Sequence, residues 1–260
     1  MENLVQRLFK DCLILVCAVV IMAGCAKKPI QIGRENPEIE IQKCIKLSDK
    51  KHFEEAIECL EMFKSRFPKS QWGIEAELYI GDNYFRQRDY LMAADSYQAF
   101  VKLHPTHPKV DYAYYKTGLS YLKHSPKAID RDQEYLDDSI ANFEIVSNNY
   151  PDTPYLNLTQ NYLTEARTKV ARRHFYVGRF YYRTGEYIAA VPRFKEIADK
   201  YRSSNLAEKS LYLMTLSNIE LGRLDDAKLA FSQISQEYPK SKYIGRLSKK
   251  LLHEVKKKGA

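Results

Sequence analysis

The stretch that decides the fold runs from Ile74 to Pro105 and reads IEAELYIGDNYFRQRDYLMAADSYQAFVKLHP. It predicts two antiparallel helices joined by a polar turn at residues 86–89, with Pro105 ending the second helix. Gly81 and Ala93 are small where the two helices must touch, and Tyr97 is large where the gap must be filled. Such a hairpin cannot bury its apolar face alone, so we expect further copies to stack against it.

Four more segments repeat this register. A small residue opens each second helix, a large apolar residue follows four places later, and a proline stands twelve places later in all but the fourth copy. The small residues are Ala56, Ala93, Ser139, Ala190 and Ala227, and the large ones are Leu60, Tyr97, Phe143, Phe194 and Phe231. The pattern resembles the tetratricopeptide repeat of about 34 residues. It predicts an all-α fold, an α-solenoid of five tetratricopeptide helix hairpins at about 37–70, 72–108, 109–153, 155–204 and 206–241.

A final amphipathic helix and basic tail occupy residues 243–260. Leu247, Leu251 and Val255 recur on one face and lysines cover the other, as a helix that caps a solenoid requires.

Residues 1–24 are typical of an export signal, with a basic flank and an apolar run too short to span a bilayer. The run ends Met22-Ala23-Gly24-Cys25, which is similar to the bacterial lipobox, although leucine is commoner than Met22. The resemblance implies cleavage before Cys25 and lipidation of that cysteine. An ordinary short anchor with a chance cysteine is the alternative. Residues 25–36 then form a lipidated flexible tether.

Cys44 and Cys59 remain in the first repeat, on opposite helices. An oxidising compartment would allow a disulfide, but two buried thiols are the simpler interpretation and the one we favour.

The composition and motifs favour a binding surface over a reaction. The net charge of +8 is compatible with an anionic membrane surface or acidic partners, and no nucleic-acid motif accompanies it. No nucleophile elbow, phosphate-binding glycine loop or zinc spacing occurs, and His104 and His107 lack a third ligand. We therefore expect no enzyme activity, no cofactor, no metal and no nucleic-acid partner.

Several longer motifs resemble the BamD family, the tetratricopeptide lipoproteins of the β-barrel assembly machinery. They are the PTHP turn at residues 105–108 followed by DY..Y..GL, the DRDQ insertion at residues 130–133, and the ANF…NNYPDTPY hairpin at residues 141–155. The stretch from Leu163 to Arg193, a long basic helix followed by an apolar run, extends the match, with Pro192 where the family usually has asparagine. We expect the first helix of the fourth repeat to run from about Leu156 through Arg183.

The register also predicts which side chains line the concave wall of first helices. For a substrate peptide we expect Phe85, Arg86, Tyr112, Tyr115 and Lys123, beside Asp82. For a protein partner we expect Arg193, implied by the resemblance, with Arg179, Tyr182 and Arg183, beside Arg172 and Phe175. Rings can take apolar side chains while arginine takes carboxylates. The alternative is that these residues form solvated helix faces.

The resemblance implies a scaffold lipid-anchored at the periplasmic face of a bacterial outer membrane. Its expected partners are the barrel-bearing assembly subunit, other assembly lipoproteins, unfolded outer-membrane protein substrates and the membrane itself. A scaffold for another envelope complex, in pilus assembly or cell-envelope constriction, would share the repeats and the lipobox. A peptidoglycan-active enzyme is the third alternative.

Overall fold

The structure, a computed structural model, describes residues 30–33, 36–129, 131 and 133–259. Within those residues every regular element is a helix, and none of the helices is long and apolar enough to cross a membrane. The expected signal at 1–24, the lipidation residue Cys25 and part of the tether lie outside the described residues.

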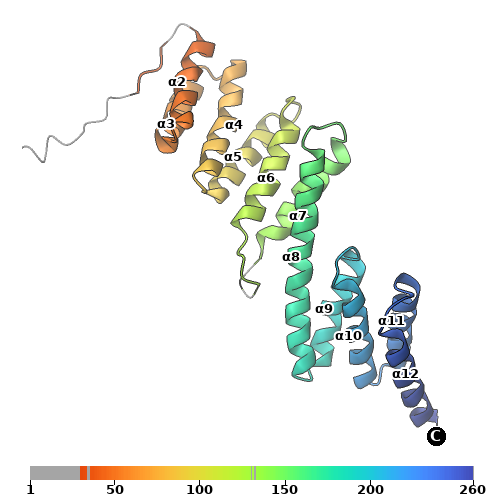
Figure 1. The fold of residues 1–260 in the computed structure, drawn as a ribbon. Helices are drawn as coiled ribbons and strands as arrows, with labels where there is room; N and C mark the ends of the chain where they lie inside the picture. Colours follow the sequence, from red (N-terminus) through yellow and green to blue (C-terminus); the bar gives the residue numbers. More distant parts are fainter. Residues whose placement is uncertain (1–29, 34–35, 130, 132, 260) are drawn as a thin grey trace, which may run out of the picture.

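The helices pair as antiparallel hairpins that stack into an elongated, curved array (Figure 1). The hairpins are α2 (Pro37–Asp49) with α3 (Phe53–Arg66), α4 (Gln71–Arg86) with α5 (Tyr90–Leu103), α6 (Val110–His124) with α7 (Tyr135–Asn149), α8 (Leu156–Arg183) with α9 (Tyr187–Lys200), and α10 (Ala207–Glu220) with α11 (Leu224–Glu237). Helix α12 (Ile244–Gly259) packs on α10 and α11 at the end. The predicted all-α solenoid of helix hairpins is confirmed.

The small residues of the sequence pattern allow the helices of a hairpin to approach closely. A Cβ added to Gly81 would lie 2.7 Å from the ring of Tyr97, and one added to Gly118 would lie 2.9 Å from the ring of Phe143. Both rings are fully buried, and so is the small residue that opens each second helix. Since close packing leaves no room for one more carbon, this register fixes how each pair of helices meets.

Most hairpin turns use a residue with a left-handed backbone. The φ angles are +64° at Lys51, +71° at Arg88, +82° at Gly185 and +69° at Gly222. This conformation ends a helix by satisfying its last carbonyls, and it favours glycine. The third hairpin has a longer connection instead, residues 125–134, of which the structure describes all but 130 and 132.

The first hairpin carries a disulfide between Cys44 and Cys59, so the expectation of two buried thiols is wrong. The S–S distance is 2.04 Å and both residues are fully buried. The antiparallel packing of α2 on α3 brings their Cα atoms to 5.4 Å, within the range that a disulfide requires.

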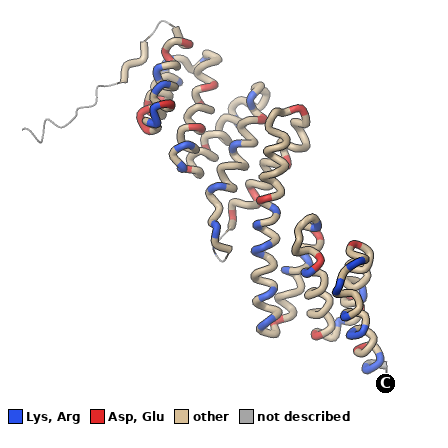
Figure 2. Tube along the Cα trace, in the orientation of Figure 1, with Lys and Arg blue, Asp and Glu red and all other residues tan. Residues whose placement is uncertain are grey.

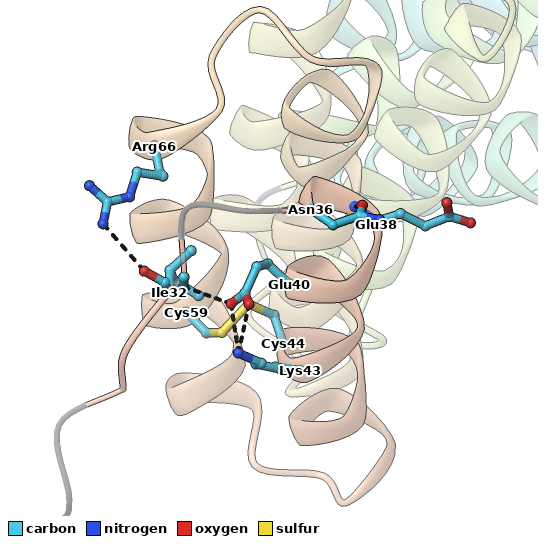
Figure 3. A network of polar contacts seen from close by, with 9 residues as sticks. Ile32, Asn36, Glu38, Glu40, Lys43, Cys44, Cys59 and Arg66 are labelled. Carbon is cyan, nitrogen blue, oxygen red and sulfur yellow. Dashed lines mark hydrogen bonds and ion pairs between the residues drawn. A yellow bond between two sulfur atoms is a disulfide. The ribbon is translucent and has the colours of Figure 1, made fainter.

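Residues 30–33 lie against this hairpin, although the sequence predicted a flexible tether. Ile30 and Ile32 pack on the apolar cluster beneath α2 and α3. The Gly33 amide donates to Glu40 Oε2 at 2.8 Å, and the Arg66 guanidinium donates to the Ile32 carbonyl at 3.4 Å (Figure 3). The short segment is therefore held by both helices of the first hairpin.

At the other end, α12 covers the last hairpin with only part of its expected face. Leu247 and Leu251 are buried, whereas Val255 is 41% exposed. Tyr243 stacks on Tyr212 with ring centroids 4.2 Å apart, and Lys250 pairs with Glu220 at 2.6 Å.

Candidate binding surfaces

The described residues contain no group of three His, Cys, Asp or Glu side chains arranged to hold a metal ion. His104 instead contacts Glu77 at 3.3 Å, and both His104 and His107 pack against the ring of Phe100. Burial lowers the pKa of His107. The two histidines thus serve the corner between the second and third hairpins.

A first candidate surface, which we call the N-terminal hollow, lies between α2, α4 and α6. Its volume is about 320 Å³. The residues that line it are Ile45, Ser48, Asp49, Tyr79, Asp82, Asn83, Arg86, Tyr112 and Lys116. The structure therefore brings together Asp82, Arg86 and Tyr112, three residues that the repeat register placed on the concave wall.

Asp82 organises this hollow. Its Oδ1 accepts hydrogen bonds from the hydroxyls of Tyr97 at 2.6 Å and Tyr112 at 2.5 Å, and it lies 3.4 Å from Lys116 Nζ. The Lys116 ammonium lies 3.8 Å from the centroid of the Phe85 ring. Burial raises the pKa of both tyrosines and lowers the pKa of Lys116, and the Asp82 carboxylate opposes the latter shift. The cluster holds one buried cation against one carboxylate and several rings.

The other predicted substrate residues lie around this cluster. Arg86 is exposed, with its guanidinium 5.3 Å from the centroid of Phe53. Tyr115 is only 7% exposed and stacks on Tyr155 at 5.2 Å, and burial raises the pKa of its phenol to about 12. Lys123 is exposed about two helical turns beyond Lys116 on α6, with its ammonium 5.4 Å from the centroid of the Tyr162 ring.

The second candidate surface, which we call the α8 groove, has a volume of about 610 Å³. It is lined by Ile129 from the α6–α7 connection, Leu206 before α10, and a stripe of α8: Arg172, Phe175, Tyr176, Arg179, Phe180, Arg183 and Thr184. The residues of this stripe are three, four or seven places apart in sequence. Because α8 is one continuous helix, residues at these spacings lie on the same face.

Two aromatic rings stand open in the α8 groove. Tyr176 is 52% exposed and Phe180 is 60% exposed, whereas Phe175 is buried against Phe194. Large apolar side chains exposed together beside a hollow mark interaction sites more often than isolated ones do.

The described residues that line the groove carry charge of one sign. Arg172, Arg179 and Arg183 are exposed, and none of them forms an ion pair with a described residue. No acidic side chain is among the described residues that line the groove. Basic residues recur along α8 in Figure 2. The connection borders this face, because Arg173 donates a hydrogen bond to the carbonyl of Arg131.

The four predicted partner-binding residues do not share one surface. Arg179 and Arg183 line the α8 groove, but Tyr182 packs edge-on against Tyr187 at 5.6 Å, and burial raises its pKa. Arg193 is exposed on α9, where its Cβ lies 3.0 Å from the position of a Cβ added to Gly178. Gly178 lies on the face of α8 that contacts α9 and is not among the residues that line the groove. Arg193 and the α8 groove therefore lie on different sides of α8.

Sequence reasoning missed three residues that shape these surfaces. Lys116 is polar in sequence but half-buried, and its partner Asp82 comes from a different hairpin. Tyr176 and Phe180 stand four places apart on the arginine-bearing face of α8, and that spacing was the signal that could have found them.

The described helices stack as hairpins and leave two open hollows of different charge, and the described residues contain no metal cluster. These features define a tetratricopeptide scaffold that presents surfaces to other molecules. The chain belongs to the YfiO family of outer membrane lipoproteins, which matches residues 42–230. The matched region covers all five hairpins except the start of α2 and the end of α11.

Several curated relatives carry the name outer membrane protein assembly factor BamD. The protein from Rickettsia prowazekii is 30% identical over 197 residues, covering 76% of this chain and 78% of that protein. The Caulobacter vibrioides protein is 24% identical over 230 residues, covering 87% and 74%. The Vibrio cholerae protein is 28% identical over 193 residues, covering 71% and 80%.

Solved structures with similar helix arrangements include the TPR2AB-domain:pHSP90 complex of yeast Sti1. It has a TM-score of 0.40 and 14% identity, and the match covers 85% of this chain and 84% of that one. A tetratricopeptide protein from Thermus thermophilus gives a TM-score of 0.37 at 16% identity, covering 84% of this chain and all of that one.

Proposed function

We propose that this chain is a non-enzymatic scaffold in the assembly of outer-membrane proteins, anchored at the periplasmic face of the outer membrane. The observation that carries this proposal is the family match across the hairpins, together with relatives named as assembly factors over most of their own length. Tetratricopeptide solenoids act by presenting extended surfaces, which is consistent with the two hollows described above.

The anchor in this proposal is the lipid on Cys25, a residue outside the described part of the chain. Each buried CH₂ of an acyl chain contributes about 0.8 kcal/mol, so two or more chains would hold the protein stably. Mass spectrometry of the membrane-extracted protein should find Cys25 as the acylated N-terminal residue. A Cys25→Ser variant that still fractionates with outer membranes would refute the anchor.

The N-terminal hollow is the proposed site for unfolded substrate. Arg86 and Tyr112 line it, and the Phe85 ring contacts Lys116 of its lining. Tyr115 and Lys123, the other proposed substrate residues, follow along α6 and contact Tyr155 and Tyr162. An exposed arginine next to half-buried rings suits an extended peptide that offers a carboxylate and apolar side chains. A photoreactive residue at position 86 should therefore form adducts with unfolded outer-membrane proteins, and one at Lys64 on α3 should not.

The C-terminal hairpins are the proposed dock for the barrel-bearing subunit and the other assembly lipoproteins. Arg193 is exposed on α9, with Tyr182 on the adjoining face of α8, while Arg179 and Arg183 add a second contact in the α8 groove. A rigid helix surface that offers several arginines provides charge-assisted contacts to carboxylates of a partner.

The experiment is an affinity purification from native membranes, with the co-purifying proteins identified by mass spectrometry. We expect the barrel-bearing subunit with the wild-type protein, strongly reduced recovery with Arg193→Glu, and unchanged recovery with Arg246→Glu, which reverses an exposed arginine on α12. Unchanged recovery with Arg193→Glu would remove that residue from the dock. Absence of any outer-membrane assembly protein from the wild-type sample would refute the proposed function.

A further inference from the structure

The α8 groove combines exposed arginines with exposed aromatic rings. In the N-terminal hollow the carboxylate of Asp82 compensates Lys116 and accepts from two phenols. In the α8 groove no described carboxylate plays that role for Arg172, Arg179 or Arg183. Among the described residues, the three arginines of the groove are therefore available to an acidic ligand.

The shape of the groove sets the size of its occupant. Arg172 and Arg183 are eleven residues apart on a continuous helix, which places them roughly 16 Å apart along its axis. A strand rises about 3.3 Å per residue, so roughly five extended residues span that distance. The exposed rings of Tyr176 and Phe180 lie between the outer arginines on the same face.

We infer that the α8 groove binds an acidic segment of a partner protein, about five residues long when extended, that places an apolar side chain between Tyr176 and Phe180 and carboxylates on the flanking arginines. This deepens the proposed function, since it assigns a chemical class to the partner that meets Arg179 and Arg183. Arginine forms planar, paired hydrogen bonds with carboxylates, and rings beside it take apolar side chains. The groove is separate from the surface around Arg193.

The walls of the groove favour a protein segment over a headgroup alone. Ile129 comes from the α6–α7 connection and Leu206 from the approach to α10, so apolar side chains stand at both borders. Together with the two exposed rings they form an apolar lining that suits an apolar side chain of the bound segment. The arginines would orient that segment through its carboxylates.

The first test uses the full chain, purified from membranes in detergent, and two fluorescein-labelled twelve-residue peptides. One alternates Glu or Asp with Leu and Phe, and the other has Lys in place of every acidic residue. Fluorescence anisotropy should show binding of the acidic peptide and none of the lysine peptide. We expect affinity to fall at least tenfold in the double variant Arg179→Glu/Arg183→Glu and severalfold in Phe180→Ala, with no change in Arg246→Glu.

These variants alter exposed side chains, and circular dichroism will confirm that each remains folded. Equal binding by the double variant and the wild type would overturn the inference, and so would equal binding of the two peptides. A third arm uses phosphatidylglycerol vesicles. If the vesicles bind the wild type and lose the double variant while the acidic peptide binds neither, the groove serves a lipid surface and the inference is wrong.

The second test places a photoreactive phenylalanine analogue at Tyr176 or Phe180 in cells, with Leu229, exposed on α11, as the control position. The mapped adduct should contain an apolar residue flanked by at least two acidic residues. Changing those acidic residues to lysine should abolish the adduct with the wild type and restore it with Arg179→Glu/Arg183→Glu. An adduct on a basic or neutral segment would overturn the inference, whereas an acidic adduct outside the assembly machinery would support it and refute only the proposed function.

Discussion

Removing the carboxylate of Asp82 should strongly destabilise the N-terminal hairpins. The change Asp82→Ala leaves the fully buried Tyr97 hydroxyl and the half-buried Tyr112 hydroxyl without their acceptor. It also leaves the ammonium of Lys116, whose side chain is only 13% exposed, without its counterion.

The magnitude follows from these losses. A buried donor without an acceptor costs about 1–3 kcal/mol, and breaking a buried ion pair from one side costs about 3–5 kcal/mol. Because the Asp82 side chain is 26% exposed and water can replace part of its role, we expect a total below the sum of these separate costs, about 3 kcal/mol. Lys116→Met alone should cost less, because a carboxylate that accepts two phenols keeps its hydrogen bonds.

Urea unfolding monitored by Trp72 is the assay. Trp72 is the single tryptophan of the chain, and it packs on the cluster shared by the first two hairpins, so its emission reports this region. The double variant Asp82→Ala/Lys116→Met should regain about half of the loss, since the uncompensated cation is gone. A free energy of unfolding for Asp82→Ala within about 1 kcal/mol of the wild type would contradict this role of Asp82, and so would a double variant no more stable than Asp82→Ala.

Three further outcomes follow from particular residues. Replacing Cys44 and Cys59 together by alanine should lower the free energy of unfolding by about 3 kcal/mol, because the bridge closes a loop of 15 residues in the unfolded chain. An unchanged urea concentration at the midpoint of unfolding, followed by Trp72 emission, would contradict this. Gly81→Ala should destabilise the protein by about 1–3 kcal/mol, because the added methyl group clashes with the Tyr97 ring. The control Gly245→Ala on α12, where a Cβ meets nothing within 4 Å, should stabilise the protein by up to about 1 kcal/mol. Equal effects of the two changes would disprove the role of close packing at Gly81. Burial lowers the folded-state pKa of His174 below its usual 6.5, so the unfolded chain binds more protons and stability should fall as pH drops from about 7 toward 5; His174→Gln should flatten that dependence, and an unaltered slope would show that other groups cause it.

The architecture was predictable because its determinants are local. A small residue such as Gly118 and a ring such as Phe143 keep a fixed offset, and the structure brings them into contact. The length of α8, expected from about Leu156 through Arg183, was confirmed because no proline interrupts that run. By contrast the bridge between Cys44 and Cys59 depends on how closely α2 and α3 approach, which sequence spacing does not determine.

The sites were less predictable because they depend on which face of each helix the stacking leaves open. On α8 the repeat register selected Arg172, Arg179 and Arg183, which are exposed in the α8 groove. It also selected Phe175 and Tyr182, whose rings pack against α9. Tyr176 follows Phe175 by one residue and lies with Phe180 on the open face of α8, which lines the groove. The repeat register alone therefore does not separate the exposed positions of this helix from the buried ones.

The 28 residues of α8 make one helix roughly 42 Å long, and it packs on α7 near its start and on α9 and α10 toward its end. Such a rod behaves as a lever. A tilt of about 5° at its first turns would carry its last turn through roughly 4 Å, given that length. A small change in how α8 packs on α7 would therefore shift the last hairpins by several ångströms relative to the first ones.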